Sequence, residues 1–283
     1  MRYCGKEFSS GQIRWIQDTI QNTAGITRQA LSKRFCETFD WRKPDGGLKD
    51  MSCRVAFLKM DRAGVITLPP PKRAYAKPGS RSRKSTLTDP KPRITTAAGK
   101  LPLHLEMVQR STSALWNEYI DRYHYLGYKA LPGAQIRYFV KAEDRILALL
   151  GFGAAAWKTA PRDKFIGWTI ATREQNLHLV VNNARFLILP WVQSKNLGSR
   201  ILSMAAKQLP DDWQARYHYR PVLLETFVEK KRFAGTCYKA ANWSYVGDTQ
   251  GRGKLDVHMQ YKLPVKSIWL YPLHKNFRTR LAI

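Results

Sequence analysis

The chain has 283 residues, 44% hydrophobic and 12% aromatic, which is enough apolar material for two packed domains. Lysine and arginine number 48 against 21 aspartates and glutamates, so the formal net charge is +27, a balance typical of a nucleic-acid-binding protein. The sequence contains no run of about eighteen apolar residues and no apolar signal core at its amino terminus, which argues against a membrane or secreted protein and indicates the cytoplasm.

The four cysteines, Cys4, Cys36, Cys53 and Cys237, are far apart in the sequence. They form no CxxC pair and have no flanking histidine at zinc spacing. The sequence therefore predicts reduced, mostly buried thiols and no metal site.

Residues 1–70 predict a helical module. Ser9 or Ser10 can cap a first helix in FSSGQIRWIQDTIQN, and Thr27 can cap a second helix in TRQALSKRFCETF. A third helix, LKDMSCRVAFLKMDRAG, leads into a brief strand from Val65 to Leu68. This pattern is typical of helix-turn-helix or winged-helix DNA-binding modules. A three-helix packing module with a solvated charged face is the alternative.

Residues 71–100 are rich in proline, glycine, serine, threonine and basic residues. That composition predicts a flexible basic linker, which can follow a phosphate backbone or can simply improve solubility. The basic residues expected to contact nucleic acid are Arg28, Lys33, Arg34, Arg42, Lys49 and Arg54 in the module, Lys72, Arg73, Arg81, Arg83 and Lys84 in the linker, and Arg137, Arg185 and Arg252 beyond it.

Residues 101–283 predict a mixed α/β layer fold. A helix ending in YHYLG precedes a hairpin, and a short strand is expected within PRDKFIGWTIATREQNLHLVV. The strand Ala184 to Leu189, the helix Ser199 to Leu209, the strand Val222 to Val228 and a short helix with a closing strand follow. The expected domains are therefore residues 1–70, 71–100 and 101–283.

The segment VQSKNLGS, residues 192–199, resembles the Q/R-x-x-G-x-G/A pyrophosphate loop of the Gcn5-related N-acetyltransferase (GNAT) fold. Gln193 and Gly198 are in register, whereas Asn196 replaces the first glycine and places a side chain where a pyrophosphate would pass. The resemblance implies a GNAT-like mixed-sheet domain. Acyl-CoA is one candidate cofactor, and the cofactor is left open. The candidate ligand-binding residues are Gln193, Asn196, Gly198, Ser199, Asn242 and Thr249.

Three residues are candidates for acid–base chemistry. By the GNAT resemblance, Tyr238 occupies the position of the family's general acid tyrosine. Glu225 lies inside an apolar strand, where a buried carboxyl acts either as a general base or as a structural partner of Arg185 or Arg137. His124, at a helix end, is either a proton shuttle or a cap.

The phrases YHYLG, RFLILPWV, LLETFVEKKRFAGTCYKAANW and GDTQGRG resemble the DruA-type family of Druantia anti-phage defence loci and transposon neighbourhoods, from about residue 31 to residue 281. The resemblance implies a DNA-related role in defence or a mobile element, with DNA and other subunits of such a system as partners.

Three functional hypotheses follow. The first is an effector whose GNAT-like domain acts on or recognises nucleic acid, and the second is a non-enzymatic DNA-binding accessory. The third is a metal-dependent nuclease using Asp163, Glu225 and Asp248, although no established nuclease spacing is present.

Overall fold

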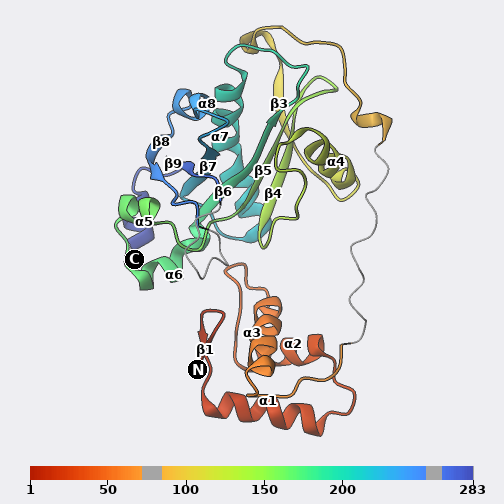
Figure 1. The fold of residues 1–283 in the computed structure, drawn as a ribbon, viewed down its shortest axis with the longest axis vertical. Helices are drawn as coiled ribbons and strands as arrows, with labels where there is room; N and C mark the ends of the chain where they lie inside the picture. Colours follow the sequence, from red (N-terminus) through yellow and green to blue (C-terminus); the bar gives the residue numbers. More distant parts are fainter. Residues whose placement is uncertain (72–84, 253–262, 283) are drawn as a thin grey trace. The chain divides into compact units, whose positions relative to one another are not determined.

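The computed structural model describes residues 1–71, 85–252 and 263–282. The chain divides into two compact units, residues 1–82 and residues 83–283 (Figure 1). Among the described residues, no helix is both long and apolar enough to cross a membrane. All four cysteines are described, and each is a free thiol.

The first unit is a short hairpin followed by three helices. Its elements are β1 (Arg2–Tyr3), β2 (Lys6–Glu7), α1 (Ser10–Asn22), α2 (Arg28–Thr38) and α3 (Asp50–Arg62). Ser9 forms a capping box with Gln12 at the start of α1, and Thr27 accepts a hydrogen bond from the backbone of Ala30 at the start of α2. The capping signals in the sequence thus place both helices.

Aromatic rings fill the core of the first unit. The ring of Phe35 lies 5.5 Å from that of Phe8 and 5.4 Å from that of Phe57, centroid to centroid. The strand expected at residues 65–68 is absent, since these described residues pair with no strand. Instead, Leu68 buries its side chain in the core and donates its backbone N–H to the Asp61 carboxylate at 2.9 Å.

The second unit is built on a seven-stranded sheet in the order β3-β4-β5-β6-β7-β9-β8. Neighbouring strands are antiparallel except β6 and β7, which are parallel. The elements of the unit are η1 (Thr86–Thr88), η2 (Ala98–Lys100), β3 (Leu103–Met107), α4 (Ser113–Tyr123), β4 (Gln135–Ala142), β5 (Arg145–Ala154), α5 (Ala160–Ile166), α6 (Ile170–Asn176), η3 (Leu177–Leu179), β6 (Val180–Ile188), α7 (Leu197–Tyr217), β7 (Leu223–Glu229), α8 (Thr236–Ala240), β8 (Ser244–Asp248), β9 (Lys266–Pro272) and α9 (Phe277–Ala282). This is the mixed α/β architecture that the sequence predicts.

Helices cover both faces of the central strands. Trp116 of α4 donates its indole N–H to the Tyr138 carbonyl and lies over Gly151, whereas the Tyr138 hydroxyl donates to Asp212 of α7 on the other face. A strand covered on both sides is apolar throughout, which explains why seven consecutive residues of β5 are buried.

Three sequence expectations need correction. The segment expected as a short strand forms α5 and α6, with Pro161 in the first turn of α5, the left-handed Gly167 at its end, and a capping box at Thr169. Helix α7 continues through Pro210 to Tyr217, because Pro210 and Trp213 are both buried in the core. Residues 85–100, expected in a flexible linker, are part of the second unit and pack against its other elements.

Two contacts order that part of the expected linker. The carboxylate of Glu118 accepts hydrogen bonds from Ser85 and Thr88, which lowers the pKa of Glu118. Ile94 is buried and forms a β-bridge with Val192. The second unit therefore begins well before residue 101.

Candidate functional site

Strands β6 and β7 separate after a short paired stretch. They pair at Val180–Leu223, Val181–Leu224 and Asn182–Glu225 only, although β6 runs on to Ile188 and β7 to Glu229. Beyond this stretch the Thr226 hydroxyl donates to the Asn183 carbonyl at 3.0 Å. In a continued β-ladder that carbonyl would accept a hydrogen bond from a backbone N–H of β7, so the side chain of Thr226 replaces the backbone pairing here. The two strands therefore enclose a wedge.

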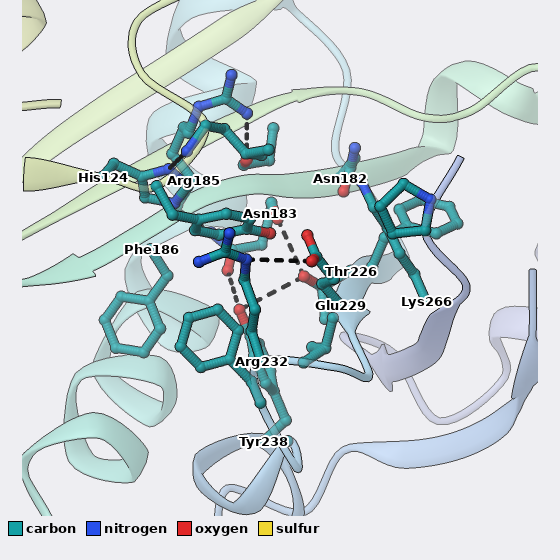
Figure 2. A pocket seen from close by; sticks show the side chains of 18 of the residues that line it. His124, Asn182, Asn183, Arg185, Phe186, Thr226, Glu229, Arg232, Tyr238 and Lys266 are labelled. Atoms are coloured by element: carbon teal, nitrogen blue, oxygen red, sulfur yellow. Dashed lines mark hydrogen bonds and ion pairs between the residues drawn. The ribbon is translucent and has the colours of Figure 1, made fainter. Parts of the chain in front are cut away.

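A pocket of about 1140 Å³ occupies this wedge and is called the wedge pocket below (Figure 2). Most of its wall comes from β6, β7, the end of α4, the loop before α8, the described residues of the β8–β9 connection and the start of β9. Its polar and charged lining residues are Tyr123, His124, Tyr125, Asn182, Asn183, Arg185, Thr226, Glu229, Arg232, Thr236, Tyr238, Thr249, Arg252 and Lys266.

A β-bulge at Ala184 directs the side chains of β6. Gly151 pairs with Arg185 and Phe152 with Asn183, so β6 carries one extra residue at this point. Asn183 and Phe186 therefore both reach Tyr238 of α8, although residues three apart on a regular strand face opposite sides. Arg185 turns the other way, toward His124 at the end of α4 (Figure 2).

The floor of the pocket is a closed hydrogen-bond network. The Tyr238 hydroxyl donates to the Asn183 side-chain oxygen at 2.8 Å, and the Asn183 amide donates to the Arg185 carbonyl at 3.1 Å. Thr226 contacts the same tyrosine oxygen at 3.4 Å. Burial raises the pKa of Tyr238, so this side chain is a neutral phenol whose proton is held by Asn183. Acid catalysis by Tyr238 would require that proton to be redirected.

His124 is held neutral at the wall of the pocket. Its Nδ1 accepts a hydrogen bond from the Leu126 backbone at 3.2 Å, so Nε2 carries the ring proton in the neutral form. Burial, followed by the nearby Arg185 charge, lowers the pKa of His124 to about 4. His124 is thus close enough to the pocket for proton transfer but is uncharged at neutral pH.

This histidine should make the stability of the second unit pH-dependent. The pKa of His124 is about 4 in the folded protein and 6.5 in an unperturbed histidine, so the folded state binds fewer protons between these values. The unfolding free energy should therefore fall as the pH drops through this window, by no more than about 2 kcal/mol because the ring is partly exposed. Urea denaturation of the wild type and of His124→Gln measures the effect. An equally steep loss in the variant would contradict the assignment.

Glu225 is absent from the lining of the wedge pocket. Its side chain is fully buried and accepts hydrogen bonds from the Ala156 backbone at 2.7 Å and from Arg162 at 2.9 Å. The expected pairing with Arg185 or Arg137 is wrong, since the cation comes from α5. Burial raises the pKa of Glu225, and the Arg162 charge opposes that rise.

The carboxylate that does line the pocket is Glu229. It is 8% exposed and accepts a hydrogen bond from the Arg232 side chain at 3.1 Å. Figure 2 shows this ion pair beside the network formed by Tyr238, Asn183 and Thr226.

The loop that resembles a pyrophosphate site lies apart from the wedge pocket. Asn196 has φ 62°, a left-handed conformation that asparagine tolerates, and stands at the N-cap position of α7 without a capping hydrogen bond from its side chain. A Cβ on Gly198 would lie 3.0 Å from the Cβ of Cys237, so this glycine allows α7 and α8 to pack closely. Gln193 is exposed, and its backbone N–H donates to the Ile94 carbonyl.

The remaining candidate ligand-binding residues fall into two places. Asn196, Ser199 and Asn242 line a second hollow of about 320 Å³ together with Arg200. Thr249 lines the wedge pocket, where its hydroxyl accepts a hydrogen bond from the Lys266 backbone at 2.9 Å. The structure therefore does not gather the six candidates into one site.

The three carboxylates of the nuclease hypothesis do not form one cluster. Asp163 and Glu225 both bind Arg162, whereas Asp248 forms an ion pair with Lys230 at the edge of the sheet. Within residues 1–71, 85–252 and 263–282, no group of three or more histidine, cysteine, aspartate or glutamate side chains is placed to hold a metal ion.

Several basic candidates already have partners within the first unit. Arg28 donates to the Pro69 carbonyl, Arg34 to Thr23, Arg42 to Asp40 and Arg54 to Asp50. Lys33 is exposed and Lys49 is half-buried. Lys72, Arg73, Arg81, Arg83 and Lys84 lie outside the described residues.

The basic candidates of the second unit differ in accessibility. Arg137 lies over the Trp116 ring and donates to Asn117 and Ser113, and burial lowers its pKa. Arg185 and Arg252 line the wedge pocket. Of the three, these two are therefore placed to meet a ligand there.

Sequence reasoning missed part of the lining of the wedge pocket. Glu229, Arg232, Phe233 and Lys266 line it without having been singled out. The run from Glu229 to Phe233, directly after a buried strand, carries charged and aromatic side chains in a short turn, and that pattern was a usable signal.

The fold and the site define a mixed α/β domain whose central parallel strands separate around a polar, cationic pocket. Similar solved structures are acetyltransferases. Aminoglycoside acetyltransferase AAC(6')-Ib with coenzyme A has 13% identity and a TM-score of 0.41, with 63% of this chain and 98% of that chain covered. The ribosomal-protein-S18-alanine N-acetyltransferase from Escherichia coli has 11% identity and a TM-score of 0.39, with 62% and 97% covered.

No curated protein matches the chain. The family model described as Druantia protein DruA matches residues 60–260, which is more than half of the chain. The chain belongs to the DruA family.

Proposed function

We propose that this chain is a nucleic-acid-binding component of a Druantia defence system or a related mobile element, with DNA as the expected partner. The wedge pocket is the proposed contact site in the second unit. The helices of the first unit, interpreted as a helix-turn-helix module, would supply a second contact.

The charge of the pocket wall carries the proposal. Among the described residues, Arg185, Arg232, Arg252 and Lys266 line the wedge pocket against one carboxylate, Glu229. They belong to a chain whose formal net charge is +27, so the local and global charges both favour a polyanion. Each phosphate that such a wall neutralises would release counterions and make the affinity depend on salt.

Removing two of these cations should weaken nucleic acid binding and reduce its salt dependence. For Arg185→Gln with Lys266→Gln, the slope of log affinity against log salt should become shallower by up to about 1.8 for duplex DNA and about 1.4 for a single strand. Fluorescence anisotropy of labelled oligonucleotides, titrated at several salt concentrations, measures the slope.

A matched control removes the same charge elsewhere. Arg145 and Lys207 are exposed residues of the second unit that do not line the pocket. Arg145→Gln with Lys207→Gln should leave the slope close to that of the wild type. Equal losses in the two double variants would show that net charge, rather than the pocket, governs binding, and no binding by the wild type would refute the proposed function.

A further inference from the structure

We propose that the wedge pocket accepts one unpaired nucleobase of a nucleic acid strand. The base stacks on an aromatic rim formed by Tyr125 and Phe233 and reaches Asn182 deeper in the pocket. This inference rests on the proposed function and specifies which part of the nucleic acid the pocket binds.

The rim presents two large aromatic side chains to solvent. Phe233 is 50% exposed and Tyr125 is 36% exposed, and both line the wedge pocket. Their ring centroids are 5.4 Å apart, and the Arg232 guanidinium lies 5.2 Å from the Tyr125 ring centroid. Exposed aromatic rings with an adjacent arginine form a stacking surface that any base can use.

The pocket also contains polar atoms that the protein leaves unsatisfied. Among the described residues, the Asn182 side-chain oxygen and the Arg185 Nε are buried without a hydrogen-bond partner. Both residues line the pocket, and Figure 2 shows them on different sides of it. By contrast, Asn183, Thr226 and Tyr238 bond to one another. Asn182 and Arg185 thus retain unused hydrogen-bonding atoms, whereas the network between them does not.

The chemistry of these two atoms fits a nucleotide. The carboxamide oxygen of Asn182 is an acceptor, which suits the exocyclic amino group of adenine, cytosine or guanine. The guanidinium of Arg185 is a donor with a positive charge, which suits a phosphate or sugar oxygen of the same strand. Base-extruding enzymes likewise combine stacking with hydrogen bonds to the edge of a base.

The pocket is large enough for part of a nucleic acid strand. Its volume of about 1140 Å³ lies above the range of roughly 300–1,000 Å³ that is usual for small-molecule sites. This volume has room for a base, its sugar and the flanking phosphates, with the phosphates near Arg232 and Lys266. A base inside a duplex is covered by its stacked neighbours, so an unpaired strand is the form that can enter.

The test uses the full chain and labelled oligonucleotides of equal length. Single-stranded DNA and single-stranded RNA are each compared with a strand of abasic sites and with a duplex of the same polymer. At least one of the two base-containing single strands should bind more tightly than the abasic strand and the duplex. The expected difference in affinity is about 5-fold to 150-fold, the range for stacking of a single base. The DNA and RNA arms identify which polymer supplies the base.

Variants of the rim separate stacking from charge. Phe233→Ala should remove most of the preference for base-containing strands while leaving the affinity for the abasic strand unchanged, and Phe233→Tyr should retain the preference. Because Phe233 is half exposed, its substitution should preserve the fold, which a thermal melt followed by circular dichroism checks. A 2-aminopurine placed in the strand should change its fluorescence on binding the wild type but not the alanine variant.

The outcomes distinguish this inference from the function on which it rests. If abasic and base-containing strands bind equally tightly, nucleic acid binding stands and base insertion is refuted. If no oligonucleotide binds the wild type, both proposals are refuted. If Phe233→Ala weakens binding of the abasic strand to the same extent, the rim contributes without stacking, and the inference is again refuted.

Discussion

Replacing Arg162 with methionine should lower the unfolding free energy of the second unit by about 3–5 kcal/mol. Arg162 and Glu225 are both fully buried and form an ion pair at 2.9 Å. The same guanidinium donates to the Ala156 carbonyl at 2.7 Å and pairs with Asp163 at 2.8 Å. Without the arginine, a buried carboxylate would lose its counter-charge, and urea denaturation measures the cost.

A second substitution should recover most of this loss. The double variant Arg162→Met with Glu225→Met removes both charges of the ion pair. Well-packed apolar replacements of buried ion pairs often change the unfolding free energy little. Arg145→Met removes an exposed arginine of the same sheet and should change the unfolding free energy by less than about 1 kcal/mol. A loss in the double variant as large as in Arg162→Met would mean that the arginine stabilises the unit through other contacts.

Substituting alanine for Gly235 should cost about 2–4 kcal/mol of unfolding free energy. Gly235 has φ +72°, a left-handed conformation that is unfavourable for alanine, and an added Cβ would lie 2.8 Å from the Trp269 ring. Strain and overpacking therefore act together at the start of α8. Thermal or urea denaturation gives the combined effect.

Gly167 provides a control with nearly the same backbone. Its φ is +82° and its ψ 19°, against 72° and 17° at Gly235, but nothing lies within 4 Å of an added Cβ. Gly167→Ala should therefore cost only the conformational part, about 1–2 kcal/mol. Equal losses at the two glycines would rule out a steric contribution from Trp269.

The sequence predicts elements whose signals are local. Ser9 and Thr27 begin helices because each side chain bonds to a backbone N–H three residues on, a pattern visible without any tertiary information. The signals of α5 and α6 were equally local, with Pro161 in the first turn, Gly167 at a helix end and Thr169 as a cap. The strand expected there was an error of interpretation, since those residues mark helices.

The wedge pocket depends on tertiary structure that no short segment encodes. The separation of the strands requires the register of β6 against both neighbours, and the bulge at Ala184 adds a residue that periodicity does not reveal. Similarly, the sequence indicates that Glu225 is buried, but its partner Arg162 lies 63 residues earlier, on a helix that was not expected. The fold, and not their spacing in the sequence, brings the candidate residues of the pocket together, among them His124, Arg185 and Tyr238.

The brief pairing of β6 with β7 also forms a seam between two halves of the sheet. On one side of this seam, strands β3 to β6 form antiparallel ladders, and on the other side β9 pairs antiparallel with both β7 and β8, whereas three residue pairs join the two halves in parallel. Beyond Asn182 the two halves are held together by side chains instead, since both Thr226 and Tyr238 donate hydrogen bonds to Asn183.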